Sequence, residues 1–258
     1  MFTNNFDPVA FEIFSISIRW YSLAYIFGII FGWIYCKKIL IKNYNIQNLF
    51  EDYITYLIIG LIIGGRLGYV IFYNLIYFLN NPIEIFMIWN GGMSFHGGLI
   101  GIIFSTYLFS KKNNEDIYIF LDLIAITAPI GIFLGRISNF INAELYGVPT
   151  EKPWGVIFPS VDTFARHPSQ IYEALLEGLI LFLILNLLVF FKRNKFGLIS
   201  GVFLIFYGLF RIICEQFREP DDHIGYIFNY LSIGTLLSFG MILFGIIFLK
   251  IVYGKENK

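Results

Sequence analysis

Three arginines lie inside long apolar stretches of the sequence, at Arg66, Arg136 and Arg211. A charge at bilayer depth costs about 2.5–3.5 kcal/mol or more unless it is paired or faces water, so each arginine is a candidate functional residue. Three such cations indicate an anionic substrate that is held within a membrane. The phosphate of a lipid headgroup is the obvious anion of that class.

The segment GRISNFINAELYG contains Arg136, Asn139 and Asn142 at three-residue steps. These side chains share one face if the helix continues, with Glu144 just beyond it near the outer interface. A guanidinium with two amides and a carboxylate can bind a phosphodiester or glycerol hydroxyls through directed hydrogen bonds. The alternative is an internal salt bridge without a ligand, for example from Arg136 to Asp122.

The segment YGLFRIICEQFREPD carries a polar stripe on an otherwise apolar helix face, formed by Tyr207, Arg211, Glu215 and Arg218. Arg211 and Glu215 are four residues apart, so the alternative to ligand binding is a pair that neutralises itself. Such a pair still has to face protein or water. Arg218, at the outer end, suits either a ligand or the level of the headgroups.

The segment WNGGMSFHGG places His96 between two pairs of glycines at the start of an apolar run. Histidine titrates near neutral pH, so it can accept a proton from a nucleophile. The alternative is a small-residue motif for helix packing, with His96 hydrogen-bonded to a neighbour at the interface.

Two further segments carry polar groups. In GGRLGYVIFYN, tight packing would bury Arg66 against a carboxylate, and this structural pairing is favoured. RHPSQIYEALLEG is typical of a helix start, with Pro168 in the first turn and Glu173 and Glu177 four residues apart. Its His167 is a second titratable candidate, for which a solvated loop position is favoured.

Several classes of site find no support in the sequence. The three histidines have no spacing of metal ligands, and no acidic cluster suits magnesium. Phosphate-binding loops, dinucleotide fingerprints and the lipase serine motif are absent as well. The formal net charge of zero gives no basic surface for nucleic acid. The residues therefore indicate acid–base and electrostatic catalysis without a metal or cofactor.

The elements that position these residues are transmembrane helices. Hydrophobic residues make up 57% of the 258, charged residues only 14%, and apolar runs near 20 residues recur. This pattern predicts an all-α polytopic membrane protein with a single domain over 1–258 and long outer loops at about 75–92 and 141–169. Seven spans are expected, at about 18–37, 54–74, 93–110, 117–140, 170–191, 197–216 and 226–251.

The basic residues between the spans predict the orientation. With seven spans, most of the loop lysines and arginines fall on one side, which the positive-inside rule assigns to the cytoplasm. The N-terminus is then outside and the C-terminus cytoplasmic. The cytoplasmic set is Lys37, Lys38, Lys42, Lys111, Lys112, Lys192, Arg193, Lys195, Lys250, Lys255 and Lys258.

The chain resembles the phosphatidylglycerol–prolipoprotein diacylglyceryl transferase family of bacterial inner membranes, because its segments occur in the order typical of that family. In chain order they are RWYSLAY (Arg19 to Tyr25), GGRLGYVIFYN, WNGGMSFHGGLIG, GRISNFINAELYG, RHPSQIYEALLEG and YGLFRIICEQFREPD. The resemblance implies seven spans with the N-terminus outside. It also implies transfer of a diacylglyceryl group from phosphatidylglycerol to the lipobox cysteine thiol of a prolipoprotein signal peptide, which forms a thioether and releases glycerol phosphate. This is the first step of lipoprotein maturation.

The resemblance also implies which positions matter. They fall on Tyr21, His96, Arg136, Asn139, Glu144, Gly147, Tyr207, Arg211 and Glu215. The family usually has glycine where this chain has Ser138 and Ala143, which are small-for-small changes. It often has arginine where this chain has Val148, which removes a possible cation from the loop.

The expected chemistry divides between a base and two cations. A thiol with a pKa of about 8.5 is mostly protonated at neutral pH, and a base such as His96 can contribute roughly 10²–10⁴-fold by removing that proton. Arg136 and Arg211 would stabilise the charge of the leaving phosphate. Glu144 and Glu215 either orient the cations or share the role of base, and the sequence does not separate these options.

Two other functions compete with the transferase. A transporter for anionic lipids or solutes would also use buried arginines, and a membrane scaffold would use polar stripes to join helices. The scaffold does not explain three arginines inside spans. The transporter has no need of His96 among glycines at the outer face.

Overall fold

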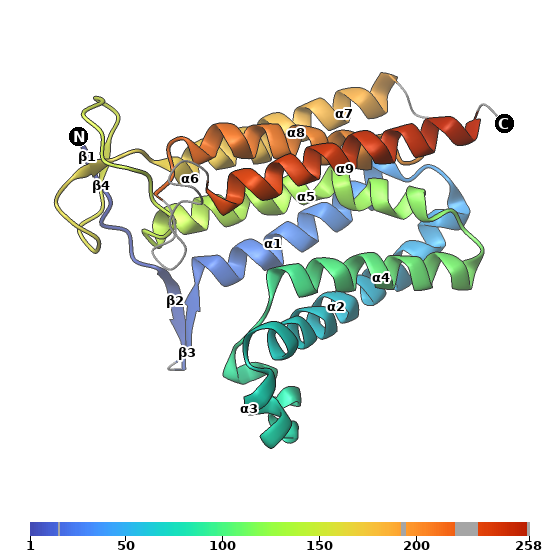
Figure 1. Ribbon diagram of the computed structural model, residues 1–258, viewed down its shortest axis with the longest axis horizontal. Helices are drawn as coiled ribbons and strands as arrows, with labels where there is room; N and C mark the ends of the chain where they lie inside the picture. Colours follow the sequence, from blue (N-terminus) through green and yellow to red (C-terminus); the bar gives the residue numbers. More distant parts are fainter. Residues whose placement is uncertain (15, 192–194, 220–231, 257–258) are drawn as a thin grey trace. The chain divides into compact units, whose positions relative to one another are not determined.

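The computed structural model is mostly helical (Figure 1). Its chain divides into two compact units. One unit comprises residues 1–35 and 122–258, and the other comprises residues 36–121. The structure describes residues 1–14, 16–191, 195–219 and 232–256. The predicted cytoplasmic residues Lys192, Arg193 and Lys258, and the predicted start of the last span near residue 226, lie outside the described residues.

Continuous apolar runs form the long helices, as expected where a segment satisfies its own backbone hydrogen bonds. They are α1 (Trp20–Tyr35), α2 (Tyr44–Tyr73), α4 (Phe95–Asn113), α5 (Ile117–Ile141), α7 (Leu181–Phe191), α8 (Leu198–Glu215) and α9 (Ile233–Glu256). Shorter helices are α3 (Leu75–Asn80), α6 (Ser169–Glu173), the 3₁₀ turns η2 (Pro82–Phe86) and η3 (Ile88–Asn90), and the π turns η1 (Cys36–Leu40) and η4 (Ala174–Ile180).

Five short strands among the described residues correct the expectation of a purely helical chain. β1 (Phe2–Thr3) pairs in parallel with β4 (Val156–Ile157), which pairs antiparallel with β5 (Ala165–Arg166). β2 (Val9–Ile13) and β3 (Ile16–Arg19) form an antiparallel hairpin directly before α1. The strands lie outside the long helices, where two to five extended residues satisfy their backbone groups by pairing.

Among the described residues, six helices are long and apolar enough to cross a membrane. They are Trp20–Leu40, Tyr44–Tyr73, Ile117–Ile141, Ser169–Phe191, Leu198–Glu215 and Ile233–Gly254. The predicted span at 93–110 is a helix, α4, but it is not one of the six. Its glycines, hydroxyl side chains and terminal lysines make it less apolar than the others.

In the second unit, α4 packs against α2 through a row of small residues. A Cβ added at Gly101 would lie 2.0 Å from the Gly60 carbonyl oxygen, and one at Gly64 would lie 2.4 Å from the Gly97 carbonyl oxygen. The two backbones therefore touch directly. For these glycines the helix-packing interpretation of the sequence is confirmed.

The contact at Gly101 leads to a stability prediction. Gly101→Val should destabilise the protein by about 3 kcal/mol or more, because the clash is with backbone that cannot rotate away. Gly240→Val in α9 is the matched control, since a Cβ there has no neighbour within 4 Å. Thermal unfolding in detergent micelles measures both. Equal midpoints for the two variants would contradict the close packing.

Candidate active site

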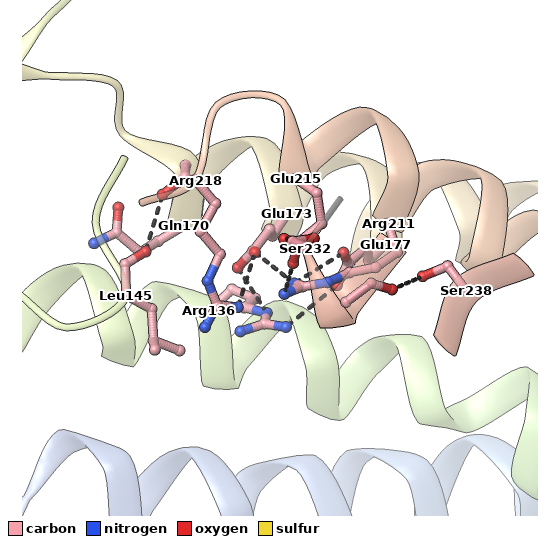
Figure 2. A network of polar contacts seen from close by, with 12 residues as sticks. Arg136, Leu145, Gln170, Glu173, Glu177, Arg211, Glu215, Arg218, Ser232 and Ser238 are labelled. Carbon is pink, nitrogen blue, oxygen red and sulfur yellow. Dashed lines mark hydrogen bonds and ion pairs between the residues drawn. The ribbon is translucent and has the colours of Figure 1, made fainter. Parts of the chain in front are cut away.

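Two of the three arginines meet in the first unit, as Figure 2 shows. Arg136 comes from α5 and Arg211 from α8, and both face the helix that carries Glu173 and Glu177. Glu173 uses one oxygen for each arginine, with Oε2 at 3.1 Å from Arg136 Nε and Oε1 at 2.6 Å from Arg211 Nη1. Glu177 Oε2 likewise lies 3.4 Å from Arg136 Nη2, and its Oε1 lies 3.5 Å from Arg211 Nη1. Two carboxylates thus bridge two guanidiniums.

The sequence interpretation assigned no role to Glu173 or Glu177, although both are fully buried. The signal was available, because a carboxylate inside an apolar span is as costly as an arginine and requires a partner. Their spacing of four residues placed both on one side of the helix. The helix widens into the π turn η4 directly after Glu173, and such turns are frequent at functional sites. The ion pair suggested for Arg136 with Asp122 is wrong. Asp122 instead accepts from the backbone N–H groups of Gly197 and Ser200, each at 2.8 Å, at the start of α8.

The network continues toward the end of α8. Arg211 also donates to Glu215, so the self-pairing suggested by the sequence is present as one part of a larger cluster. Glu215 in turn accepts from the Ser232 hydroxyl at 2.7 Å, just before α9. Arg218 Nη1 lies 3.6 Å from Glu173 Oε1. The polar stripe of α8 therefore faces protein.

Arg136 retains one unused donor. Its Nε and Nη2 atoms face Glu173 and Glu177, whereas Nη1 has no partner within the described part of the chain. The side chain of Arg136 is 17% exposed, compared with 0% for both glutamates. A ligand can therefore reach this guanidinium without first breaking an ion pair.

The amides expected beside Arg136 bind a carboxylate instead. Asn139 donates to Glu144 Oε2 at 3.2 Å, and Asn142 donates to Glu144 Oε1 at 3.4 Å. Glu144 is exposed, directly after α5 ends. Asn142 Oδ1 is buried without a hydrogen-bond partner among the described residues. This second polar group therefore has an accessible carboxylate held by two amides.

Two tyrosines implied by the family resemblance also lie in this unit. Tyr207 is on α8, one turn before Arg211, and its ring stacks on Phe203 at 5.6 Å. Tyr21 is in the first turn of α1, where its hydroxyl lies 3.1 Å from that of Tyr25.

Gly147 is required by the fold of the loop formed by residues 141–169. A Cβ there would lie 2.4 Å from the carbonyl oxygens of both His167 and Phe217, so only glycine fits between these segments. The next residue, Val148, donates its N–H to Phe217 O and accepts from His167 N, each at 3.0 Å. The position that often carries arginine in the family thus ties the loop to the end of α8 through its backbone.

Ala143 is more than a small-for-small change. Its φ is +56°, a left-handed conformation that glycine adopts without strain. Ser138 is a different case, since its hydroxyl donates to Trp20 O at 3.2 Å and joins α5 to the start of α1.

Ala143→Gly should therefore stabilise the protein. Relief of left-handed strain, at about 1–2 kcal/mol, exceeds the entropy that glycine adds to the unfolded chain, at about 0.4–1 kcal/mol. For a chain of this size we expect the midpoint of thermal unfolding to rise by about 2–4 °C. Ala125→Gly inside α5 should lower it, because glycine weakens a helix interior. A fall in both variants would rule out strain at Ala143.

Arg166 holds the loop of residues 141–169 together, a role that the sequence did not predict. Its guanidinium lies 2.6 Å from Asp162 and 3.0 Å from Glu219, and it donates to Gly147 O at 3.0 Å. The hydrogen bond from Arg166 lowers the pKa of the Asp162 carboxyl, and the same bond raises the pKa of Arg166. These contacts connect the loop to the residues directly after α8.

His167 is half-buried rather than solvated as the sequence favoured. Its ring packs on Phe217 at 5.1 Å, and Nδ1 lies 3.1 Å from the Tyr172 hydroxyl. Burial lowers the pKa of His167, and the nearby charge of Lys152 lowers it further. The neutral imidazole is therefore favoured.

The other two predicted residues, His96 and Arg66, belong to the second unit. His96 is exposed in the first turn of α4, where the Ser94 side chain caps the helix by accepting from Gly97 N at 3.2 Å. The imidazole is thus on a rigid element and open to a ligand.

Arg66 is buried on α2 and donates only to backbone, so the predicted carboxylate partner is wrong. The acceptors, at 2.5–3.3 Å, are the carbonyl oxygens of Glu84, Ile85, Met87, Gly91 and Gly92. Two of these carbonyls, Glu84 O and Met87 O, also accept the backbone N–H groups of Met87 and Asn90, so Arg66 adds a second donor to the turns. Arg66 therefore braces the segment that leads to α4.

Residues 8–251 match the sequence profile of one protein family, described as prolipoprotein diacylglyceryl transferase. The chain belongs to the prolipoprotein diacylglyceryl transferase family. It is a transferase, and its apolar helices make it a multi-pass membrane protein. The match covers the arginine cluster, the Glu144 group and the His96 motif together.

Close relatives support this assignment. The chain is 52% identical over 248 residues to the phosphatidylglycerol–prolipoprotein diacylglyceryl transferase of Rickettsia bellii (strain OSU 85-389), which covers 94% of each chain. It is 53% identical over 249 residues to that of Rickettsia typhi, covering 95% of this chain and 96% of the relative. The enzyme of Rickettsia felis is 50% identical over 246 residues, which cover 93% of this chain and 95% of the relative.

Proposed function

We propose that Arg136 and Arg211 bind the phosphodiester of phosphatidylglycerol while this chain transfers the diacylglyceryl group to the lipobox cysteine of a prolipoprotein. The observation that carries the proposal is the shared pair of buried carboxylates, which keeps the two guanidiniums side by side. Guanidinium suits a phosphate because its planar donors match the spacing of two phosphate oxygens.

The reaction determines what these residues do. The thiolate sulfur forms a bond to the glycerol carbon of the diacylglyceryl group, and the bond from that carbon to the phosphodiester oxygen breaks. The leaving group is glycerol phosphate, which carries one more negative charge than the phosphodiester did. Arg136 and Arg211 stabilise that developing charge in a site of low dielectric, where fixed cations act most strongly. The free Nη1 of Arg136 makes the first contact with the phosphate.

The thiol proton needs an acceptor, and His96 is the proposed base. It is exposed at the capped start of α4, so its ring is open to a substrate. Glu144 is the second candidate, because it is an exposed carboxylate that the side-chain amides of Asn139 and Asn142 hold in place. Glu215 is less suited to the role, since Arg211 and Ser232 both engage its oxygens.

The proposed topology has seven spans in the bacterial inner membrane. The contacts of α4 with α2 extend from Gly68 and Gly97 at one end to Tyr53 and Thr106, whose hydroxyls lie 3.1 Å apart. A helix that packs so closely along a candidate span crosses the membrane beside it. Seven spans place Lys37, Lys111, Lys195 and their neighbours on one side, which puts the N-terminus outside.

One assay tests the function. The purified chain is incubated with phosphatidylglycerol and a peptide that contains a lipobox cysteine, and the mass of the peptide is measured. We expect the mass of one diacylglyceryl group to be added at the cysteine and glycerol phosphate to be released. A folded protein that yields no adduct would exclude the proposal, and movement of lipid between vesicle leaflets without adduct would favour the transporter.

A further inference from the structure

Glu173 and Glu177 are the least exposed charged residues of the cluster, and the reaction as described assigns them no step. Each carboxylate contacts both arginines, through a separate oxygen for each (Figure 2). Two guanidiniums placed side by side repel each other, and the effect is large where water is excluded. The bridging carboxylates offset this repulsion and set the separation of the arginines.

Over the described residues, the cluster is also balanced in charge. Three arginines contact three glutamates within it, namely Arg136, Arg211 and Arg218 with Glu173, Glu177 and Glu215. A site built only to attract anions would keep a positive excess. The arginine–glutamate cluster instead offers guanidinium donors to an anion while its own charges cancel.

The balance matters most for release of the product. Glycerol phosphate carries more negative charge than the phosphodiester from which it forms, so a strongly cationic site would bind the product more tightly than the substrate. Product release limits the turnover of many enzymes. A neutral cluster does not bind the product so tightly, and its arginines can still stabilise the charge that develops on the leaving phosphate.

We infer that Glu173 and Glu177 are positioning residues that hold Arg136 and Arg211 at the spacing of one phosphodiester and weaken the hold of the site on glycerol phosphate. This inference rests on the proposed function, because it assumes the same phosphate ligand. Glu177 is the better residue to test. Its ion pairs within the described part of the chain are with Arg136 and Arg211, at 3.4–3.5 Å, whereas Glu173 also lies near Arg218.

The test is Glu177→Gln, which keeps the size of the side chain and removes one negative charge. In the full-length protein, we expect kcat to fall by at least about tenfold, because the arginines lose their spacing. The inhibition constant of glycerol phosphate should also fall, by about tenfold, as expected when one charge is removed a few ångströms from an anion. Glu177→Asp retains the charge and should keep the inhibition constant near that of the unaltered protein.

Glu51→Gln is the matched control. Glu51 is exposed, pairs with Lys37 in the other unit, and should alter neither constant when replaced. If Glu177→Gln does not fold, Glu173→Gln tests the same charge. A lower kcat with an unchanged or raised inhibition constant would overturn the inference, since a merely structural role has that result. Unaltered kcat would overturn it as well.

Different measurements test the proposed transfer reaction and the positioning role of Glu173 and Glu177. The shift in unfolding temperature that glycerol phosphate causes can be measured without any peptide, so it reports the charge of the site whether or not transfer occurs. A larger shift in Glu177→Gln than in the unaltered protein supports the inference. Absence of transfer by the unaltered protein contradicts only the proposed reaction.

Discussion

Replacing Arg136 by lysine should lower kcat/KM for phosphatidylglycerol by roughly 10²–10³-fold, the usual effect of removing one donor to a developing oxyanion. Lysine keeps the positive charge but concentrates it on one nitrogen. Its single nitrogen cannot occupy the separate positions from which Arg136 Nε and Nη2 contact Glu173 and Glu177 while Nη1 points to a phosphate. The loss should therefore appear although the net charge of the cluster is unchanged. Initial rates of peptide modification, measured over a range of lipid concentrations, give the value.

Arg19→Lys provides the control for this prediction. Arg19 is an exposed arginine at the end of β3, in the same unit but outside the cluster. Its replacement should leave kcat/KM within about twofold of the unaltered protein, since exposed substitutions of this kind have small effects. If Arg136→Lys retained a comparable rate, charge alone would suffice, and the geometric role of the guanidinium would have to be abandoned.

Replacing His96 by glutamine should lower kcat by roughly 10²–10⁴-fold, which is the range of general base catalysis. Glutamine can still form hydrogen bonds but does not accept a proton near neutral pH. The variant should recover part of its rate at alkaline pH, because the thiol with a pKa of about 8.5 then ionises without help. The pH dependence of kcat shows both effects.

The same substitution at the second described histidine, His167→Gln, separates the base from a general effect of losing an imidazole. His167 packs against Phe217 and Tyr172, so its loss should change stability more than kcat. Full activity of His96→Gln would remove His96 from the role of base. Glu144→Gln would then be the decisive variant, since Glu144 is the other accessible acceptor.

The arginine cluster shows how far a sequence can be interpreted. Arg136 and Arg211 were predicted to be functional because an unpaired charge inside the bilayer is high in free energy. A cation inside an apolar run therefore needs a partner in any fold of the chain. The same rule applied to Glu173 and Glu177, but their segment was interpreted as a helix start and its carboxylates were given no partner. The ion pairs join residues 34–41 positions apart, so only the fold could assign them.

Arg66 illustrates the opposite error. Its position in an apolar helix predicted a carboxylate partner, yet it binds five backbone carbonyls that local propensity does not reveal. Those carbonyls come from the 3₁₀ turns of residues 82–90 and from the two glycines that follow, which the fold brings to the guanidinium. The partner of a buried cation depends on which acceptors the packed chain places around it.

By itself, the sequence determined that this is a helical membrane protein of the prolipoprotein diacylglyceryl transferase family, and it identified most of the candidate residues. Short segments of sequence determine hydropathy, spacing along one helix and local motifs. These properties can therefore be recognised without knowledge of the fold. Only the tertiary structure decided that Glu173 and Glu177 bridge the two arginines, that Glu144 is held by Asn139 and Asn142, and that Ala143 adopts a left-handed backbone. Each of these depends on contacts or dihedral angles that the packed chain imposes.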